Sequence, residues 1–129
     1  MSARLALDAR RAREFFRVDV RLVSIIADIL LPSWPTALAV VSSIYRTPEE
    51  DAAVGGSGVH CTRPHRAVDI AADRWDDPLV WEVAHAINRE WQYDPARPHK
   101  QCALYRRHGT GPHVHLQVHP RTQRRMRHA

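Results

Sequence analysis

The sequence has no long hydrophobic run, only two cysteines and a single lysine. The longest apolar stretch, residues 25–31, contains Asp28 and is far shorter than the roughly 20 residues that a membrane-spanning helix needs. We therefore expect no membrane span. The two cysteines, Cys61 and Cys102, form no CxxC pair and are too few for a disulfide scaffold, so we expect reduced thiols.

Both ends of the sequence also lack recognisable patterns. The N-terminal residues have no basic start, apolar centre and small-residue cleavage site of a secretory signal, so we expect synthesis in the cytoplasm without a Sec signal. Residues 1–18 are rich in Arg and Ala with little periodicity, which predicts a poorly structured leader or a frayed helix. Residues 121–129 are predicted to be a basic tail that adds nothing to the core.

What is present is enough for one folded domain. The chain has 129 residues, of which 44% are hydrophobic and 26% charged, which allows a single core but not two. The net charge of +5 favours anionic partners, such as nucleic acid, membrane surfaces or cell-wall polymers. Five of the nine histidines fall within residues 99–119, and this concentration indicates a chemical role.

The apolar pattern alternates between helical and strand spacing. Helices are predicted after Asp19 and over residues 78–91, each followed by proline. The first has the apolar residues Val20, Val23, Ile26, Ala27 and Leu30 at helical spacing. Between these helices, the β-branched run at residues 38–45 and the apolar run at residues 67–72 predict strands.

The remaining segments complete a small domain. Residues 46–58 form a Gly-rich loop with one possible helical turn, which Thr47 and Glu50 would cap. Residues 101–106 and 113–119 alternate apolar and polar side chains, which indicates a β-hairpin. We predict an α+β fold: a single domain over residues 19–120, with a mainly antiparallel sheet flanked by helices.

Two histidines in the last predicted strand indicate a metal or acid/base site. His113 and His115 are two residues apart, so both side chains project from one face of the sheet. A catalytic zinc site takes three protein ligands and keeps one position open. His60 follows the Gly-rich loop, and Asp69 lies within an apolar strand, where an unpaired carboxylate would be costly.

These segments resemble a known family, in order and in sequence. The matching motifs are YRTPEE at residues 45–50, SGVH and RAVDI within residues 57–70, and HVH at residues 113–115. They resemble the zinc peptidases that include bacterial D-Ala-D-Ala carboxypeptidases and dipeptidases, phage endopeptidases and the Hedgehog fold. The family shows YRSPE, then SxH with an Asp seven residues after the His, then ExxH or HxH. The resemblance covers residues 19–120.

The resemblance implies a function for each matching residue. His60, Asp69 and His115 would bind Zn²⁺, and His113 would be the acid/base group. Arg46 would contact the substrate near the reacting carbonyl or its terminal carboxylate, since a guanidinium matches either group. The implied activity is hydrolysis of amide bonds in peptidoglycan stem peptides, by a monomer that acts on the cell wall after phage release or from a virion.

The sequence departs from the family pattern at two places. Asp69 follows His60 by nine residues instead of seven, so the loop carries a two-residue insertion or His65 replaces His60 as the ligand. We favour His60, because its SGVH context matches. The residue three before His115 is Pro112 and not Glu, which excludes the ExxH form of the base.

Two other function classes remain open. The same fold can be a zinc-bearing binding module that has lost hydrolysis. The HVHLQV segment also resembles the paired-His motif of metal-dependent enzymes that nick single-stranded DNA through a tyrosine. All three tyrosines, Tyr45, Tyr93 and Tyr105, precede the motif here, whereas those enzymes usually place the nucleophile after it. Nucleic acid is therefore the less favoured partner.

Overall fold

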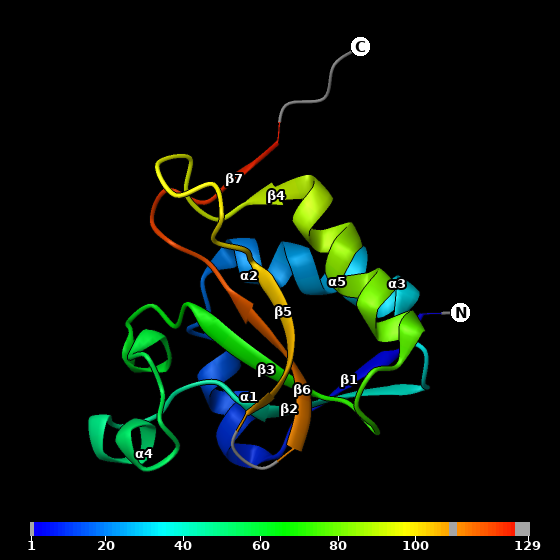
Figure 1. Cartoon of the computed structure of the whole chain (residues 1–129). Coiled ribbons are helices and arrows are strands. Elements are labelled where there is room, and N and C mark those ends of the chain that lie inside the picture. Colours follow the sequence, from blue (N-terminus) through cyan, green and yellow to red (C-terminus); the bar gives the residue numbers. More distant parts are fainter. Residues whose placement is uncertain (1, 109–110, 126–129) are drawn as a thin grey trace.

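The computed structural model describes residues 2–108 and 111–125, and its centre is a five-stranded sheet (Figure 1). The strand order is β1 (Arg4–Ala6), β2 (Leu38–Ser43), β3 (Ala67–Ala71), β6 (Gly111–Gln117) and β5 (Ala103–His108). Only β1 and β2 pair in parallel, and all other neighbours pair antiparallel. The predicted α+β class with a mainly antiparallel sheet is confirmed, as is the hairpin of β5 and β6.

Helices and two short strands surround this sheet. They are α1 (Ala9–Phe15), α2 (Val20–Ile25), the π-helical turn η1 (Ile26–Leu30), α3 (Leu31–Ser33), α4 (Pro48–Ala53), the 3-10 turn η2 (Val59–Cys61), α5 (Pro78–Glu90), β4 (Trp91–Gln92) and β7 (Gln123–Arg124). The predicted capping box is present at the N-terminus of α4, where the side chains of Thr47 and Glu50 each accept a hydrogen bond from the other residue's main-chain N–H group. Among the described helices, none has the length and apolar character to cross a membrane.

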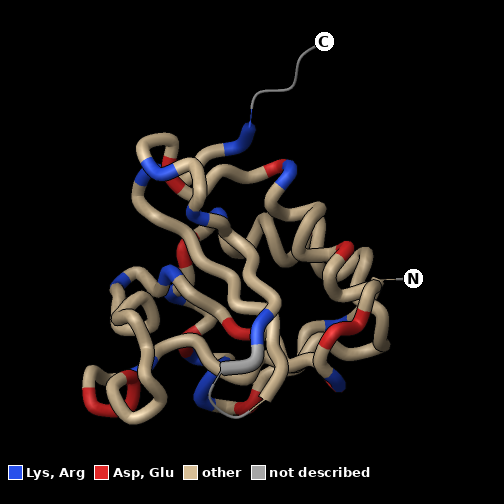
Figure 2. Tube along the Cα trace, viewed as in Figure 1, with Lys and Arg blue, Asp and Glu red and all other residues tan. Residues whose placement is uncertain are grey.

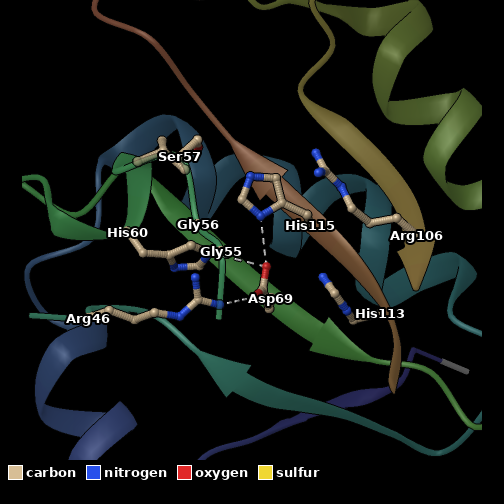
Figure 3. A pocket seen from close by; sticks show the side chains of 10 residues that line it. Arg46, Gly55, Gly56, Ser57, His60, Asp69, Arg106, His113 and His115 are labelled. Carbon is tan, nitrogen blue, oxygen red and sulfur yellow. Dashed lines mark hydrogen bonds and ion pairs between the residues drawn. The ribbon is translucent and has the colours of Figure 1, made fainter. Parts of the chain in front are cut away.

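One face of the sheet builds the hydrophobic core, and the opposite face builds the site. Successive side chains of a strand point to opposite faces. Val68 and Ile70 of β3 belong to the same buried cluster as Leu22 of α2 and Ile87 of α5. Asp69, which lies between Val68 and Ile70 in sequence, points away from that cluster and towards Arg46 and towards His60 of η2 (Figure 3).

The helix after Asp19 forms, but its buried face matches the predicted one only in part: Ile26 and Leu30 are buried as predicted, whereas Val20, Val23 and Ala27 are exposed. Val20 and Val23 are 73% and 36% exposed, whereas Leu22 and Ile25 are fully buried. Almost every position of this segment is apolar, so the spacing allows two stripes, and the bulkier leucine and isoleucine side chains fill the core. The π-helical turn at Ile26–Leu30 also shifts the register of the last turn.

The predicted boundary at residue 18 differs from the structure. Ala3 and Val18 are buried in the core, and β1 extends the sheet beside β2. Arg10 of α1 reaches the carboxylate of Glu50 and the carbonyl of Tyr45. These partners are distant in sequence, so local periodicity could not show that residues 2–18 belong to the domain.

The boundary at residue 120 also differs. The Thr122 side chain is buried and donates a hydrogen bond of 2.7 Å to the carbonyl of Tyr93, and β7 pairs with β4. The first part of the predicted tail is therefore packed against the domain. Residues 126–129 of that tail, and residues 109–110 of the predicted hairpin turn, lie outside the described residues.

A matched pair of substitutions tests which face of α2 is buried. Leu22→Ala removes a fully buried side chain and should lower the free energy of unfolding by about 2–5 kcal/mol. Val20→Ala, two residues earlier on an exposed position, should change it by less than about 0.5 kcal/mol. Urea unfolding of both variants measures the difference. Equal losses would contradict this placement of the helix.

Candidate metal centre

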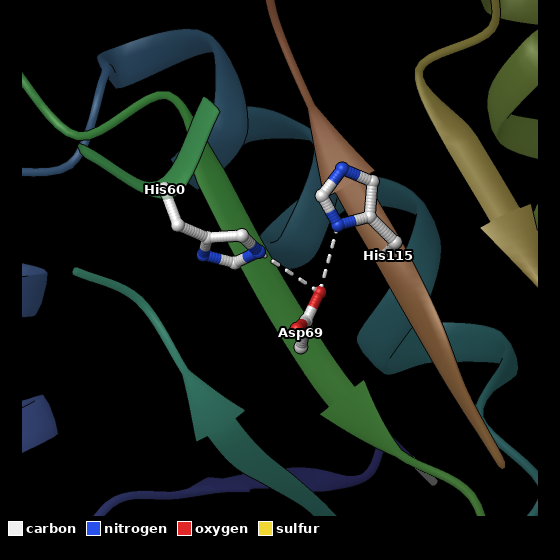
Figure 4. Close-up of side chains that lie close together, drawn as sticks. All are labelled: His60, Asp69 and His115. Carbon is white, nitrogen blue, oxygen red and sulfur yellow. Dashed lines mark hydrogen bonds and ion pairs between the residues drawn. The ribbon is translucent and has the colours of Figure 1, made fainter. Parts of the chain in front are cut away.

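The structure brings together the three residues that the sequence analysis assigned as metal ligands (Figure 4). Asp69 of β3 lies directly opposite His115 of β6 in the antiparallel register, and η2 places His60 beside them. All three are buried, with 3% of His60, 4% of Asp69 and 7% of His115 exposed. One ligand atom from each lies within 4.8 Å of the others.

A main-chain carbonyl fixes the tautomer of the neutral His60 ring. Nδ1 lies 2.7 Å from the carbonyl oxygen of Ile44, and because a carbonyl only accepts, Nδ1 carries the proton. The lone pair of the neutral ring is therefore on Nε2, which lies 3.3 Å from Asp69 Oδ1. This buried Nε2 atom makes no hydrogen bond within the described part of the chain. A buried ring nitrogen with a free lone pair, whose other ring nitrogen is held by a carbonyl, has the arrangement of a histidine that binds a metal ion.

A glutamine fixes the His115 ring in the same way. The Gln117 amide nitrogen donates to the Gln101 carbonyl at 2.8 Å, which turns the amide oxygen towards His115 Nε2 at 3.0 Å. Nε2 of His115 therefore carries the proton. Nδ1 is left facing Asp69 Oδ1 at 2.8 Å. The sequence analysis did not find Gln117, although its position two residues after His115 on the same strand face was the available signal.

Three atoms that can share a proton or bind a metal ion converge at this point, namely His60 Nε2, Asp69 Oδ1 and His115 Nδ1. Burial raises the pKa of Asp69, but the interactions with His115 and His60 outweigh that effect and hold the pKa well below its usual range. Asp69 is therefore ionised. Arg46 pairs with its Oδ2 atom, and its Oδ1 atom, which faces the two imidazoles, can accept a proton from one of them or bind a metal ion. Two imidazoles and one carboxylate form a donor set that can hold a metal ion.

His65, the alternative ligand, has another role in the structure. It is buried, its Nδ1 lies 2.9 Å from the Thr62 carbonyl, and its ring packs on Tyr45. Its main-chain N–H donates to Arg17 and its carbonyl accepts from Asp19. His65 thus fastens the loop after η2 to the N-terminal segment, and it is not part of the His60–Asp69–His115 group.

Arg46 lies beside the metal centre and is held by two carboxylates (Figure 3). One terminal nitrogen is 3.1 Å from Asp69 Oδ2, and the other is 3.0 Å from Asp51 Oδ1. Asp51 is itself buried and accepts the main-chain N–H of Gly58 at 2.9 Å. A Cβ on Gly56 would lie 2.1 Å from the Asp51 carboxylate, so the glycine allows the loop to close over this residue.

Asp51 was missed by the sequence analysis, as was Arg106. Asp51 is one of three consecutive acidic residues at the start of α4, and nothing in that run marks it as the buried one. Arg106 lines the cavity because β5 places it opposite His113. The alternation of the hairpin offered a signal for Arg106, but only once the pairing register was known.

His113 lines the same cavity as the His60–Asp69–His115 group. Its Nδ1 lies 2.9 Å from the Gly111 carbonyl, so Nδ1 carries the proton and Nε2 is the basic nitrogen of the neutral ring. The His113 side chain is half-buried, which leaves it accessible to a molecule in the cavity. All five residues assigned from the sequence, namely Arg46, His60, Asp69, His113 and His115, therefore line one cavity.

Comparison with known proteins finds no matching family model, no matching curated protein and no matching solved structure. The resemblance to the zinc peptidases therefore depends on the motifs and their order. The Hedgehog-type details of the fold stay a prediction.

Metal content tests the assignment of the ligands. We expect about one zinc ion per chain in protein dialysed against zinc and then against metal-free buffer. Loss of His60, Asp69 or His115 by substitution with alanine should weaken zinc binding by more than the roughly 10–100-fold that loss of an outer hydrogen-bond partner costs. His85→Ala, on an exposed position of α5, is the control and should keep the zinc.

The same measurement separates the two candidate histidines. His65→Ala should retain zinc, provided that circular dichroism shows it folded. Zinc retained by His60→Ala and lost by a folded His65→Ala would contradict the assignment.

Proposed function

We propose that this chain is a zinc-dependent peptidase that hydrolyses amide bonds in peptidoglycan stem peptides. The observation that carries the proposal is the buried His60–Asp69–His115 group, with an unsatisfied His60 Nε2, in one cavity with His113 and Arg46. A site with three protein ligands and an accessible cavity fits catalytic rather than purely structural zinc. The substrate class follows from the resemblance, and the net positive charge suits an anionic cell wall.

In this proposal His113 moves the proton. A zinc ion held by His60, Asp69 and His115 would supply Lewis acidity, which would polarise the scissile carbonyl and make water a stronger acid. The basic Nε2 of His113 accepts the proton of the attacking water and delivers it to the leaving amine. The hydrogen bond from Nδ1 to the Gly111 carbonyl holds the ring in the tautomer that this step needs.

Arg46 stabilises the charge that develops on the substrate. A guanidinium has five N–H donors, and the contacts with Asp69 and Asp51 use one on each terminal nitrogen. The remaining donors serve a carbonyl oxygen as it becomes an oxyanion. Asp51 holds the guanidinium in place, so Arg46 does not have to be ordered when the substrate binds.

The positions of the three tyrosines give less support to the DNA-nicking alternative. Tyr93 and Tyr105 are buried, with 8% and 4% exposed. Tyr45 packs on His65 and is covered by the Arg63 guanidinium. None of the three tyrosines lines the hollow that holds the His60–Asp69–His115 group, where a nucleophile would have to act, although Tyr45 lines the hollow beside it. In the peptidase proposal the protein works as a monomer, on walls that it reaches after phage release or as part of a virion.

The His113→Gln variant tests the proposal. Zinc-loaded wild-type protein should release soluble peptides from purified peptidoglycan, and His113→Gln should lower kcat by about 10²–10⁴-fold while keeping its zinc, because only the proton transfer is removed. His85→Gln is the matched control and should behave as wild type. Full activity in His113→Gln would refute its role. A zinc-loaded wild type that cleaves neither walls nor synthetic stem peptides would leave a zinc-bearing binding module.

A further inference from the structure

The cavity of the metal centre continues along the N-terminal helix. A second hollow, between α1 and β2, shares Arg46, Asp69 and His113 with the metal cavity. A third hollow shares Arg10 and Tyr45 with the second. A chain bound at the metal centre can therefore run through the second hollow into the third. We call the third hollow the arginine groove, and its distinguishing side chains are Arg13, Arg17 and Arg63 around Tyr45.

The arginine groove carries uncompensated positive charge. Arg10 is paired with Glu14 and Glu50, so its charge is balanced. Arg13, Arg17 and Arg63 are exposed and have no carboxylate within ion-pair distance among the described residues. Glu14 is the one carboxylate that lines this hollow, and it is already paired with Arg10. Three like charges around one hollow repel each other, and a bound anion relieves that repulsion.

The groove is also ordered on one side. The Arg63 guanidinium lies over the Tyr45 ring, 4.3 Å from its centroid, and His65 supports the other part of that ring. A stacked guanidinium keeps its planar edge free for two parallel hydrogen bonds to a carboxylate. The packing on Tyr45 therefore holds the positive charge of Arg63 in a defined position on one wall of the groove.

Arg46 is already paired inside the metal centre, so a carboxylate farther along the substrate needs other basic residues to bind it. It contacts Asp69 and Asp51, both of which are already negatively charged partners inside the site. We propose that the arginine groove binds a carboxylate of the peptide substrate that lies away from the scissile bond, with Arg13, Arg17 and Arg63 as its partners. This inference rests on the proposed peptidase function, and it makes an acidic peptide the preferred substrate class.

Two peptides and two double variants test the groove. The probes are a synthetic stem peptide with free carboxylates and the same peptide with its carboxylates amidated. Arg13→Gln/Arg17→Gln should raise KM about tenfold for the acidic peptide, without a change in kcat, and should leave the amidated peptide unaffected. Arg4→Gln/Arg89→Gln removes the same charge from exposed positions outside the hollows and is the control, which should change neither. Equal effects of the two double variants would overturn the proposal.

A binding measurement separates failure of the groove from failure of the proposed function. Calorimetry with the same two peptides measures binding directly, and where the wild type turns the peptides over it is done in the His113→Gln background, which slows turnover. If wild-type protein hydrolyses neither peptide but binds the acidic form more tightly, and only Arg13→Gln/Arg17→Gln loses that preference, the peptidase proposal fails and the groove stands. Equal binding of both peptides would overturn the groove. Tighter binding of a single-stranded oligonucleotide at the same salt concentration, lost in that variant, would also overturn it and indicate nucleic acid.

Discussion

The structure depends on one buried negative charge in the middle of the sheet. Asp69 lies between Val68 and Ile70, which are both fully buried, and its own carboxylate is almost completely removed from solvent. A carboxylate in such a place is tolerated only when cationic or donor groups surround it. His60, His115 and Arg46 come from three separate segments of the chain and meet at this carboxylate. The loops around the site are arranged to keep these three groups there.

Each group is in turn held by a partner outside the metal centre. The Ile44 carbonyl fixes His60, Gln117 fixes His115, and Asp51 fixes Arg46. The antiparallel register of β3 and β6 sets the distance between Asp69 and His115. These supports belong to the sheet, to the residue after β2 and to helix α4, so the fold itself positions the site, which reduces the ordering cost of binding a metal or substrate. Figure 2 shows the acidic residues interspersed with the basic residues along the chain.

The sequence predicted the parts of the site that repeat a local pattern. The HxH alternation placed His113 and His115 on one face, and the apolar run around Asp69 indicated a buried carboxylate that needs partners. Strands β5 and β6 and helix α5 followed from their periodicity, and strands β2 and β3 from short apolar, β-branched runs. The supporting residues could not be predicted this way, because Asp51 and Gln117 are distinguished only by what they contact across the fold. The helical alternative for the N-terminal segment agrees with α1, but its packing on the domain was missed for the same reason: β1 and α1 are short, and their partners lie in β2 and α4.

The central claim is that His60 Nε2, an oxygen of Asp69 and His115 Nδ1 bind one zinc ion. The most direct test is a crystal structure of the zinc-loaded protein with anomalous diffraction measured on both sides of the zinc absorption edge. The account predicts one strong peak that disappears below the edge, about 2.0–2.2 Å from each of these three atoms. A peak at His65 or at another histidine, or no peak in the cavity of a protein that retains the folded sheet, would contradict it.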